Sequence, residues 1–260
     1  DKNVYLNPEE KMSILRYLKM DGKAAPIRRV MIPKPGKKEK RPLGIPIVID
    51  RAKQALVVFA LEPEWEAKFE ANSYGFRPGR RTHDAAEAIF THTRGENGAQ
   101  KFVLDADLKG CFDNIDHNYL LNCLSPQLPK MRNQIKSWLK AGFVNGFLDL
   151  DTYNQIEKNS RGTPQGGVIS PLLSNIALHG AENMLKQWAM TARDPKGGKG
   201  ADAFLVKTKF NNKIDRANSL GFIRYADDFV LIHKEKRVLI AAREKLSEFF
   251  AKTSKLTFNE

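Results

Sequence analysis

Two adjacent carboxylates, Asp227 and Asp228, lie between the apolar arms of a segment with the pattern of a β-hairpin, residues 223–233. Like charges side by side repel each other, and neighbouring β-structure supplies no counter-charge, so the pattern favours a bound cation. With a third carboxylate, such a turn could hold two divalent ions, as in in-line phosphoryl transfer. The alternative is an ordinary solvated β-turn.

The third carboxylate is predicted on a strand that spans residues 101–108. Side chains alternate along a strand, so Asp105 and Asp107 share one face while the apolar residues between them point to the other. Asp107 is the candidate ligand and Asp105 its competitor. Carboxylate ligands without a histidine cluster favour Mg²⁺, or alternatively Mn²⁺, over zinc.

The elements that must position these carboxylates are helices and strands in irregular alternation, which predicts an α+β fold. Asn7 and Pro8 can cap and start a first helix that ends near residue 21. Other helices are expected at 50–69, 82–93, 118–124, 129–141, 170–191 and 236–252. Strands are expected at 28–32, 43–45 and 203–209, with a further hairpin before residue 162. Residues 193–218 are a candidate insertion.

The charge of the chain indicates a polyanionic partner. The 260 residues carry a net charge of +13, and residues 23–53 contain ten basic residues against two acidic ones. The alternative is a solvated basic face. Apolar stretches are too short to span a membrane, and two cysteines without a CxxC motif fit a reducing, intracellular compartment.

Five sequence blocks carry a family resemblance. They are 41–51 (RPLGIPIVIDR), 73–80 (SYGFRPGR), 103–113 (VLDADLKGCFD), 162–173 (GTPQGGVISPLL) and 225–228 (YADD). In this order they resemble the signature blocks of group II intron-encoded reverse transcriptases, the intron maturases. The resemblance covers about residues 27–232, nearly the whole chain.

The resemblance implies a right-hand polymerase fold with fingers and a palm that carries an antiparallel sheet. Residues 1–100 would be mainly fingers, with a remnant of an N-terminal extension. Residues 101–260 would be mainly palm, with finger elements and the insertion at about 193–218. A helical thumb is not visible in the sequence, so we expect a fingers–palm unit without it.

The resemblance also implies site residues. Asp107, Asp227 and Asp228 would be catalytic and, with the carbonyl of Leu108, would bind two Mg²⁺ ions. The deoxynucleotide would be bound by Lys34, Arg41, Phe112, Gln165 and Gly166, and nucleic acid by Arg77, Arg80 and Tyr225. The ring of Phe112 would exclude a 2′-hydroxyl, its alternative being a plain core aromatic. For Arg77 and Arg80 the alternative is a purely structural role.

The implied function is RNA-directed DNA polymerisation by two-metal nucleotidyl transfer. The protein would also bind intron RNA to aid splicing and retrohoming. Its partners would be an intron RNA template, a DNA or RNA primer and deoxynucleotides, with no membrane, and homo-oligomerisation is left open. The compartment would be a bacterial cytoplasm or an organelle. The alternatives are a splicing-only maturase and an intron-like reverse transcriptase recruited to a defence or CRISPR-associated role.

Overall fold

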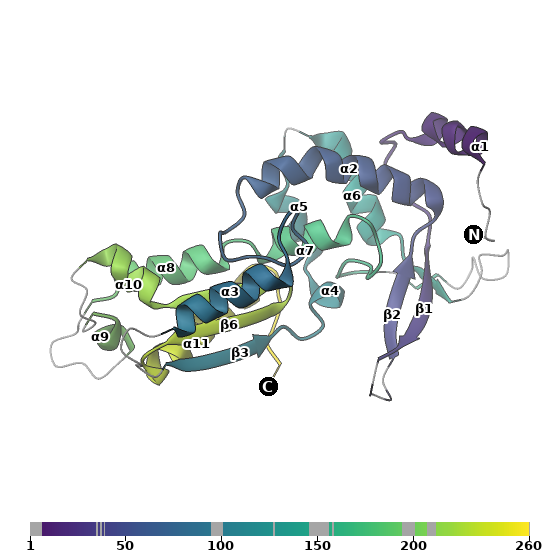
Figure 1. Ribbon diagram of the computed structural model, residues 1–260. Coiled ribbons are helices and arrows are strands. Elements are labelled where there is room, and N and C mark those ends of the chain that lie inside the picture. The colour runs from purple at the N-terminus through teal and green to yellow at the C-terminus, as the bar shows by residue number, and fades with distance from the viewer. Residues whose placement is uncertain are drawn as a thin grey trace. The chain divides into compact units, whose positions relative to one another are not determined.

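The computed structural model describes residues 7–259 except 35, 37, 39, 95–100, 127, 146–155, 158, 194–200 and 207–211. The chain forms two compact units (Figure 1). The first combines Asp1–Ala67 with Gly110–Ala177, and the second combines Lys68–Lys109 with Leu178–Glu260. Among the helices that the structure describes, none has the length and apolar character that crossing a bilayer requires.

The first unit contains a small sheet and several helices. Strands β1 (Ile27–Pro33) and β2 (Lys40–Ile45) form an antiparallel hairpin, and β4 (Phe143–Asn145) pairs in parallel with β1. The helices are α1 (Pro8–Ser13), the 3₁₀ helix η1 (Ile14–Tyr17), α2 (Val48–Glu66), α4 (Cys111–Asn114), α5 (His117–Cys123), α6 (Pro129–Lys140) and most of α7 (Ser170–Leu178).

The second unit contains an antiparallel sheet of order β3-β6-β5. Its strands are β3 (Phe102–Asp107), β5 (Gly221–Tyr225) and β6 (Asp228–His233). Its helices are α3 (Thr82–Thr93), α8 (Ala181–Thr191), α9 (Ala201–Val206), α10 (Lys213–Ser219) and α11 (Lys236–Lys252).

Helices cover both faces of this second sheet (Figure 1). On the α3 face, Ile223 and Ile232 pack with Tyr74 and Ala85. On the α11 face, the ring of Phe229 lies among three other phenylalanine rings at centroid distances of 5.5–5.9 Å. Alternation along β6 therefore buries Phe229 on one face while Asp228 points to the other.

Most predicted elements are confirmed, but several boundaries are wrong. The predicted helix 170–191 is two helices, because Gly180 lies at φ +97° between α7 and α8. The first helix has the predicted Asn7 cap but its helical turns end at Tyr17. Within the predicted strand 203–209, the described residues 203–206 belong to α9, and the rest lies outside the described residues.

The hairpin predicted before residue 162 is described only in part. Phe143 forms an isolated antiparallel bridge with Glu157, while residues 146–155 lie outside the described residues. His117, the first residue of α5, is buried, with Nε2 donating to the carbonyl of Gly162 at 2.7 Å. The helix does start beside a cap, Asp116, but the first turn of α5 faces inward.

Buried His233 predicts a stability that falls in acid. Burial lowers the pKa of His233 from its ordinary value to about 4, and its Nδ1 accepts a hydrogen bond from the Glu235 amide at 2.9 Å. Between pH 4 and pH 6.5 only the unfolded state takes up this proton, so stability is full above about 6.5 and is lost as the pH falls. The loss is about 3 kcal/mol. Thermal unfolding against pH should show it, and His233→Gln should flatten the profile over this window.

Candidate functional site

The register of the second sheet brings carboxylates together at one end. Asp107 lies directly opposite Asp228 in the β3–β6 ladder, and Asp227 precedes Asp228 in the turn that joins β5 to β6. Directly opposed residues have Cβ atoms about 4.5–5.5 Å apart. Asp105 lies two residues back on β3, opposite Val230. The three predicted catalytic carboxylates are thus neighbours in the structure.

The crowding of these carboxylates shows in the pKa of Asp228. Partial burial raises this pKa above its ordinary value, and the negative charges of Asp227, Asp107 and Asp105 raise it further. The side chain itself remains exposed. A cation bound here would relieve the repulsion that the ionised carboxylates exert on one another.

A neighbouring chain segment fixes Asp107. The side-chain amide of Asn259 donates to Oδ2 of Asp107 at 2.7 Å, and the Asn259 backbone amide donates to the Asp107 carbonyl at 2.9 Å. Leu108, a predicted metal ligand through its carbonyl, is buried and forms an antiparallel bridge with Phe258. The sequence pattern did not predict that residues 257–259 would pair with the end of β3.

The donor chemistry of the carboxylates fits a hard divalent ion, since all three side chains offer oxygen. Within the described residues, however, no three His, Cys, Asp or Glu side chains converge as a finished metal site. The Asp107 carboxylate is engaged by Asn259 instead. Ion binding at these residues therefore requires that the side chains turn toward a common point.

The turn that carries Asp227 is supported by the loop that contains the 73–80 block. The Arg224 amide donates to the Asn72 carbonyl at 2.8 Å, the Tyr74 amide donates to the Arg224 carbonyl at 2.9 Å, and Ser73 bridges to Arg224 in parallel. The buried Arg224 guanidinium also donates to the carbonyl of Ala226 at 3.0 Å. The loop thus lies along β5 like a short extra strand that ends at the turn.

Gly75 makes the closest approach to this turn. A Cβ at this position would lie 2.3 Å from the backbone nitrogen of Ala226, far inside contact distance. Ala226 itself adopts φ +56°, in the left-handed region that residues other than glycine rarely occupy. The turn therefore has an unusual backbone conformation, and the absence of a side chain at Gly75 leaves room for it.

Arg77 is buried and binds backbone. It is 6% exposed, and its Nη1 donates to the carbonyls of Glu70 and Ser73, both at 2.7 Å. These contacts hold the loop closed. They agree with the alternative for Arg77, a purely structural role. Contact between Arg77 and nucleic acid stays a prediction, and a ligand would have to displace the loop to reach the guanidinium.

Arg80 and Tyr225 are more accessible. Arg80 donates to the Ala71 carbonyl at 2.6 Å, with its guanidinium 5.3 Å from the centroid of the Tyr74 ring. Tyr225 lies opposite Asp228 at the end of β5 and is half-buried. A contact between Tyr225 and a primer end stays a prediction.

The predicted triphosphate-binding cations lie on the first unit. Arg41 is exposed on β2 opposite Ile32, and Lys34 follows Pro33, the last paired residue of β1. Both cations therefore stand at the outer end of the β1–β2 hairpin. Residues 35, 37 and 39 of its tip lie outside the described residues.

The 162–173 block packs against the same hairpin. The Gly44 amide donates to the Gln165 carbonyl at 2.6 Å, and a Cβ on Gly166, at φ +110°, would lie 2.8 Å from the Gly44 oxygen. The Thr163 amide donates to the carbonyl of half-buried Phe112 at 2.6 Å. Phe112, Gln165 and Gly166 are thus held together in one unit, next to the basic hairpin.

Comparison with known families agrees with these features. Residues 32–260 match the family described as reverse transcriptase (RNA-dependent DNA polymerase). The match covers most of the chain, including both units and all five sequence blocks. The chain belongs to the reverse transcriptase family.

Two bacterial proteins are among the relatives of this chain, and one of them is intron-encoded by name. The group II intron-encoded protein LtrA of Lactococcus lactis subsp. cremoris is 32% identical, over 90% of this chain and 43% of its own length. Protein YkfC of Escherichia coli (strain K12) is 34% identical, over 90% of this chain and 61% of its own. The predicted resemblance to group II intron-encoded proteins is confirmed, and the chain spans about half the length of these relatives.

Solved structures confirm the fold class. Telomerase from Candida albicans, in complex with a fragment of telomeric RNA, superposes with a TM-score of 0.54 at 16% identity, over 96% of this chain and 44% of its own. Apo telomerase from Candida tropicalis gives a TM-score of 0.57 at 13% identity, over 93% of this chain and 44% of its own. At these identities the likeness concerns the fold alone.

Proposed function

We propose that this chain is the RNA-directed DNA polymerase domain of a group II intron-encoded protein. The observation that carries the proposal is the register that places Asp107 opposite Asp228, beside Asp227. This register makes three carboxylates neighbours, nucleotidyl transfer uses such oxygen ligands to hold divalent ions, and the chain belongs to a family described by that activity.

In this proposal Asp107, Asp227 and Asp228 hold two Mg²⁺ ions, with the Leu108 carbonyl as a further ligand. Divalent ions bound there would supply charge neutralisation for the attacking 3′-hydroxyl and for the leaving pyrophosphate. Lys34 and Arg41 would bind the triphosphate, the arginine through two parallel hydrogen bonds. Tyr225 would contact the primer end, and the loop around Gly75 would keep the carboxylates in place.

The two units correspond, in this proposal, to fingers and palm elements. The unit with the basic hairpin would supply the nucleotide-binding residues, and the unit with the β3-β6-β5 sheet would supply the carboxylates. The boundary predicted at residues 100–101 and the insertion at 193–218 stay predictions.

The proposed partners are a template RNA, a DNA or RNA primer and deoxynucleotides, as well as intron RNA. The name of the LtrA relative and the net charge of +13 support an intron RNA partner. Such an interface should lose affinity steeply as salt rises, because the cations replace counterions of the phosphates. A bacterial or organellar compartment stays a prediction.

Phe112 should set the choice of sugar. We expect Phe112→Ala to raise incorporation of ribonucleotides relative to deoxynucleotides by about 10²-fold, because removal of the ring makes room for a 2′-hydroxyl. Competition between the two nucleotide types in single-turnover extension measures this ratio. Phe102→Ala, at an exposed aromatic in the other unit, is the control and should leave the ratio unchanged. An unchanged ratio in Phe112→Ala would make this ring a core residue only.

Primer extension on an RNA template tests the proposal as a whole. The full-length protein should incorporate deoxynucleotides with Mg²⁺. Binding and splicing of intron RNA without any DNA synthesis would instead establish a splicing-only maturase.

A further inference from the structure

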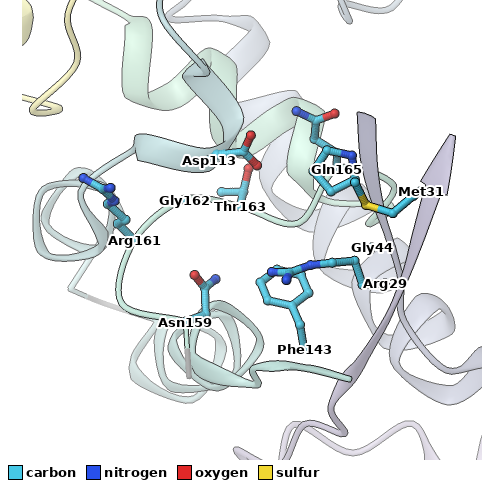
Figure 2. A pocket seen from close by; sticks show the side chains of 11 residues that line it. Arg29, Met31, Gly44, Asp113, Phe143, Asn159, Arg161, Gly162, Thr163 and Gln165 are labelled. Atoms are coloured by element: carbon cyan, nitrogen blue, oxygen red, sulfur yellow. The ribbon is translucent and has the colours of Figure 1, made fainter. Parts of the chain in front are cut away.

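The first unit contains a cavity of about 370 Å³ that the proposed catalysis leaves almost unused (Figure 2). It is bordered by β1, β2, β4, α4 and the segment 159–165, all within this unit. Of its lining residues only Gln165 has a proposed role. The volume is large enough for one nucleobase with its sugar.

One wall of the cavity is a fixed flat surface. The Arg29 guanidinium lies 4.3 Å from the centroid of the Phe143 ring (Figure 2). Its Nη1 donates to Oε2 of Glu157 at 2.6 Å. Stacking and ion pairing together fix the guanidinium plane. Unpaired bases of RNA stack on aromatic rings and on arginine planes of this kind.

Other lining residues offer hydrogen-bond acceptors. They are Asp113, on α4, and Asn159 and Gln165, on the segment 159–165 (Figure 2). The side-chain amide nitrogen of Asn159 donates to the Leu139 carbonyl at 3.0 Å, so the Asn159 side-chain oxygen is the group that can accept from a ligand. Within the described residues, the Asp113 carboxylate accepts no hydrogen bond and the buried hydroxyl of Thr163 has no partner.

The backbone holds Asp113 at this cavity. A Cβ on Gly162 would lie 2.5 Å from the carbonyl carbon and oxygen of Asp113, so the two segments touch. Partial burial raises the pKa of Asp113 above its ordinary value, while the charges of Arg29 and Arg41 lower it. Asp113 is nevertheless exposed, so a ligand in the cavity can reach the carboxylate and donate hydrogen bonds to it.

We propose that this cavity binds a guanine base, stacked on Arg29 and hydrogen-bonded to Asp113. An ionised carboxylate only accepts, so it selects an edge with adjacent donors. Guanine presents N1–H and N2–H₂ side by side, whereas uracil presents a single N–H between two carbonyl oxygens. The site goes beyond the proposed polymerisation, which must accept all four bases alike.

Fluorescence anisotropy of short labelled RNAs tests the proposal without catalysis. In EDTA, the probe U₄GU₄ should bind about tenfold more tightly than U₉, and more tightly than U₄AU₄ or U₄CU₄. Asp113→Asn keeps the size of the side chain but offers a donor, so it should abolish the preference for guanine. The matched control Asp105→Asn, an exposed carboxylate of the second unit, should keep it.

Competition with guanosine monophosphate identifies the source of the base. Displacement of U₄GU₄ would support a free guanine nucleotide as ligand, and a preference that resists displacement would support a guanine within an RNA strand. Equal binding of all four probes, or a preference unchanged in Asp113→Asn, would overturn the proposal. Asp227→Ala should retain the preference for guanine even if this variant makes no DNA. The binding test therefore gives its result independently of the polymerase proposal.

Discussion

Replacing Asp227 by alanine should abolish DNA synthesis while leaving the fold intact. The proposed loss is about 10³-fold or more in the rate of primer extension, because one of the three carboxylates that would hold the metal ions disappears. The free energy of unfolding should change by no more than about 0.5 kcal/mol, since the side chain lies in a turn and its removal relieves the repulsion on Asp228. Single-turnover extension and thermal unfolding measure the two effects.

Asp105→Ala is the matched control for this prediction. Asp105 lies on the same strand as Asp107, two residues away, and is exposed. Asp105→Ala removes one negative charge, as Asp227→Ala does, and should leave synthesis close to that of the unchanged protein. Loss of synthesis in Asp105→Ala with activity retained in Asp227→Ala would show that the ligands have been assigned to the wrong carboxylates.

Gly75→Ala should slow synthesis through the backbone of the turn. The added Cβ would lie 2.3 Å from the nitrogen of Ala226, so either the loop or the turn must move. We expect a loss of about 1–3 kcal/mol in the free energy of unfolding. Displacement of the adjacent carboxylates should lower the rate by about 10²-fold, measured well below the unfolding temperature. The Mg²⁺ concentration for half-maximal rate should rise, which a purely structural defect would not cause.

A second glycine of the same sheet provides the control. Gly221 is at the start of β5, away from the turn, and an added Cβ would meet the His92 side chain at 3.0 Å. Gly221→Ala can therefore lower stability without moving the carboxylates.

Adding Ala226→Gly to Gly75→Ala should recover part of the rate, because glycine accepts the positive φ of the turn and lets the turn adjust. An unchanged Mg²⁺ requirement in Gly75→Ala would contradict a positioning role.

The local patterns of the sequence predicted the sheet and the basic hairpin well. Strict alternation around Asp107 and the apolar arms around Asp227 each define a strand and its exposed face. Their pairing in one sheet followed from the family resemblance, because neither segment alone identifies its partner. The Asp107–Asp228 register then matches the expected gathering of carboxylates.

Features that depend on contacts between distant segments could not be predicted. Arg77 appears as a cation in a loop, and only the fold shows that its guanidinium binds the carbonyls of Glu70 and Ser73. His117 follows a helix cap, yet its ring binds Gly162, 45 residues away. The break at Gly180 was missed because an isolated glycine is compatible with a continuous helix.

The most direct measurement is primer extension by the full-length protein on an RNA template with Mg²⁺, comparing deoxynucleotides with ribonucleotides. We predict template-dependent incorporation of deoxynucleotides that disappears in Asp227→Ala. Unchanged synthesis in a folded Asp227→Ala protein would contradict catalysis by these carboxylates.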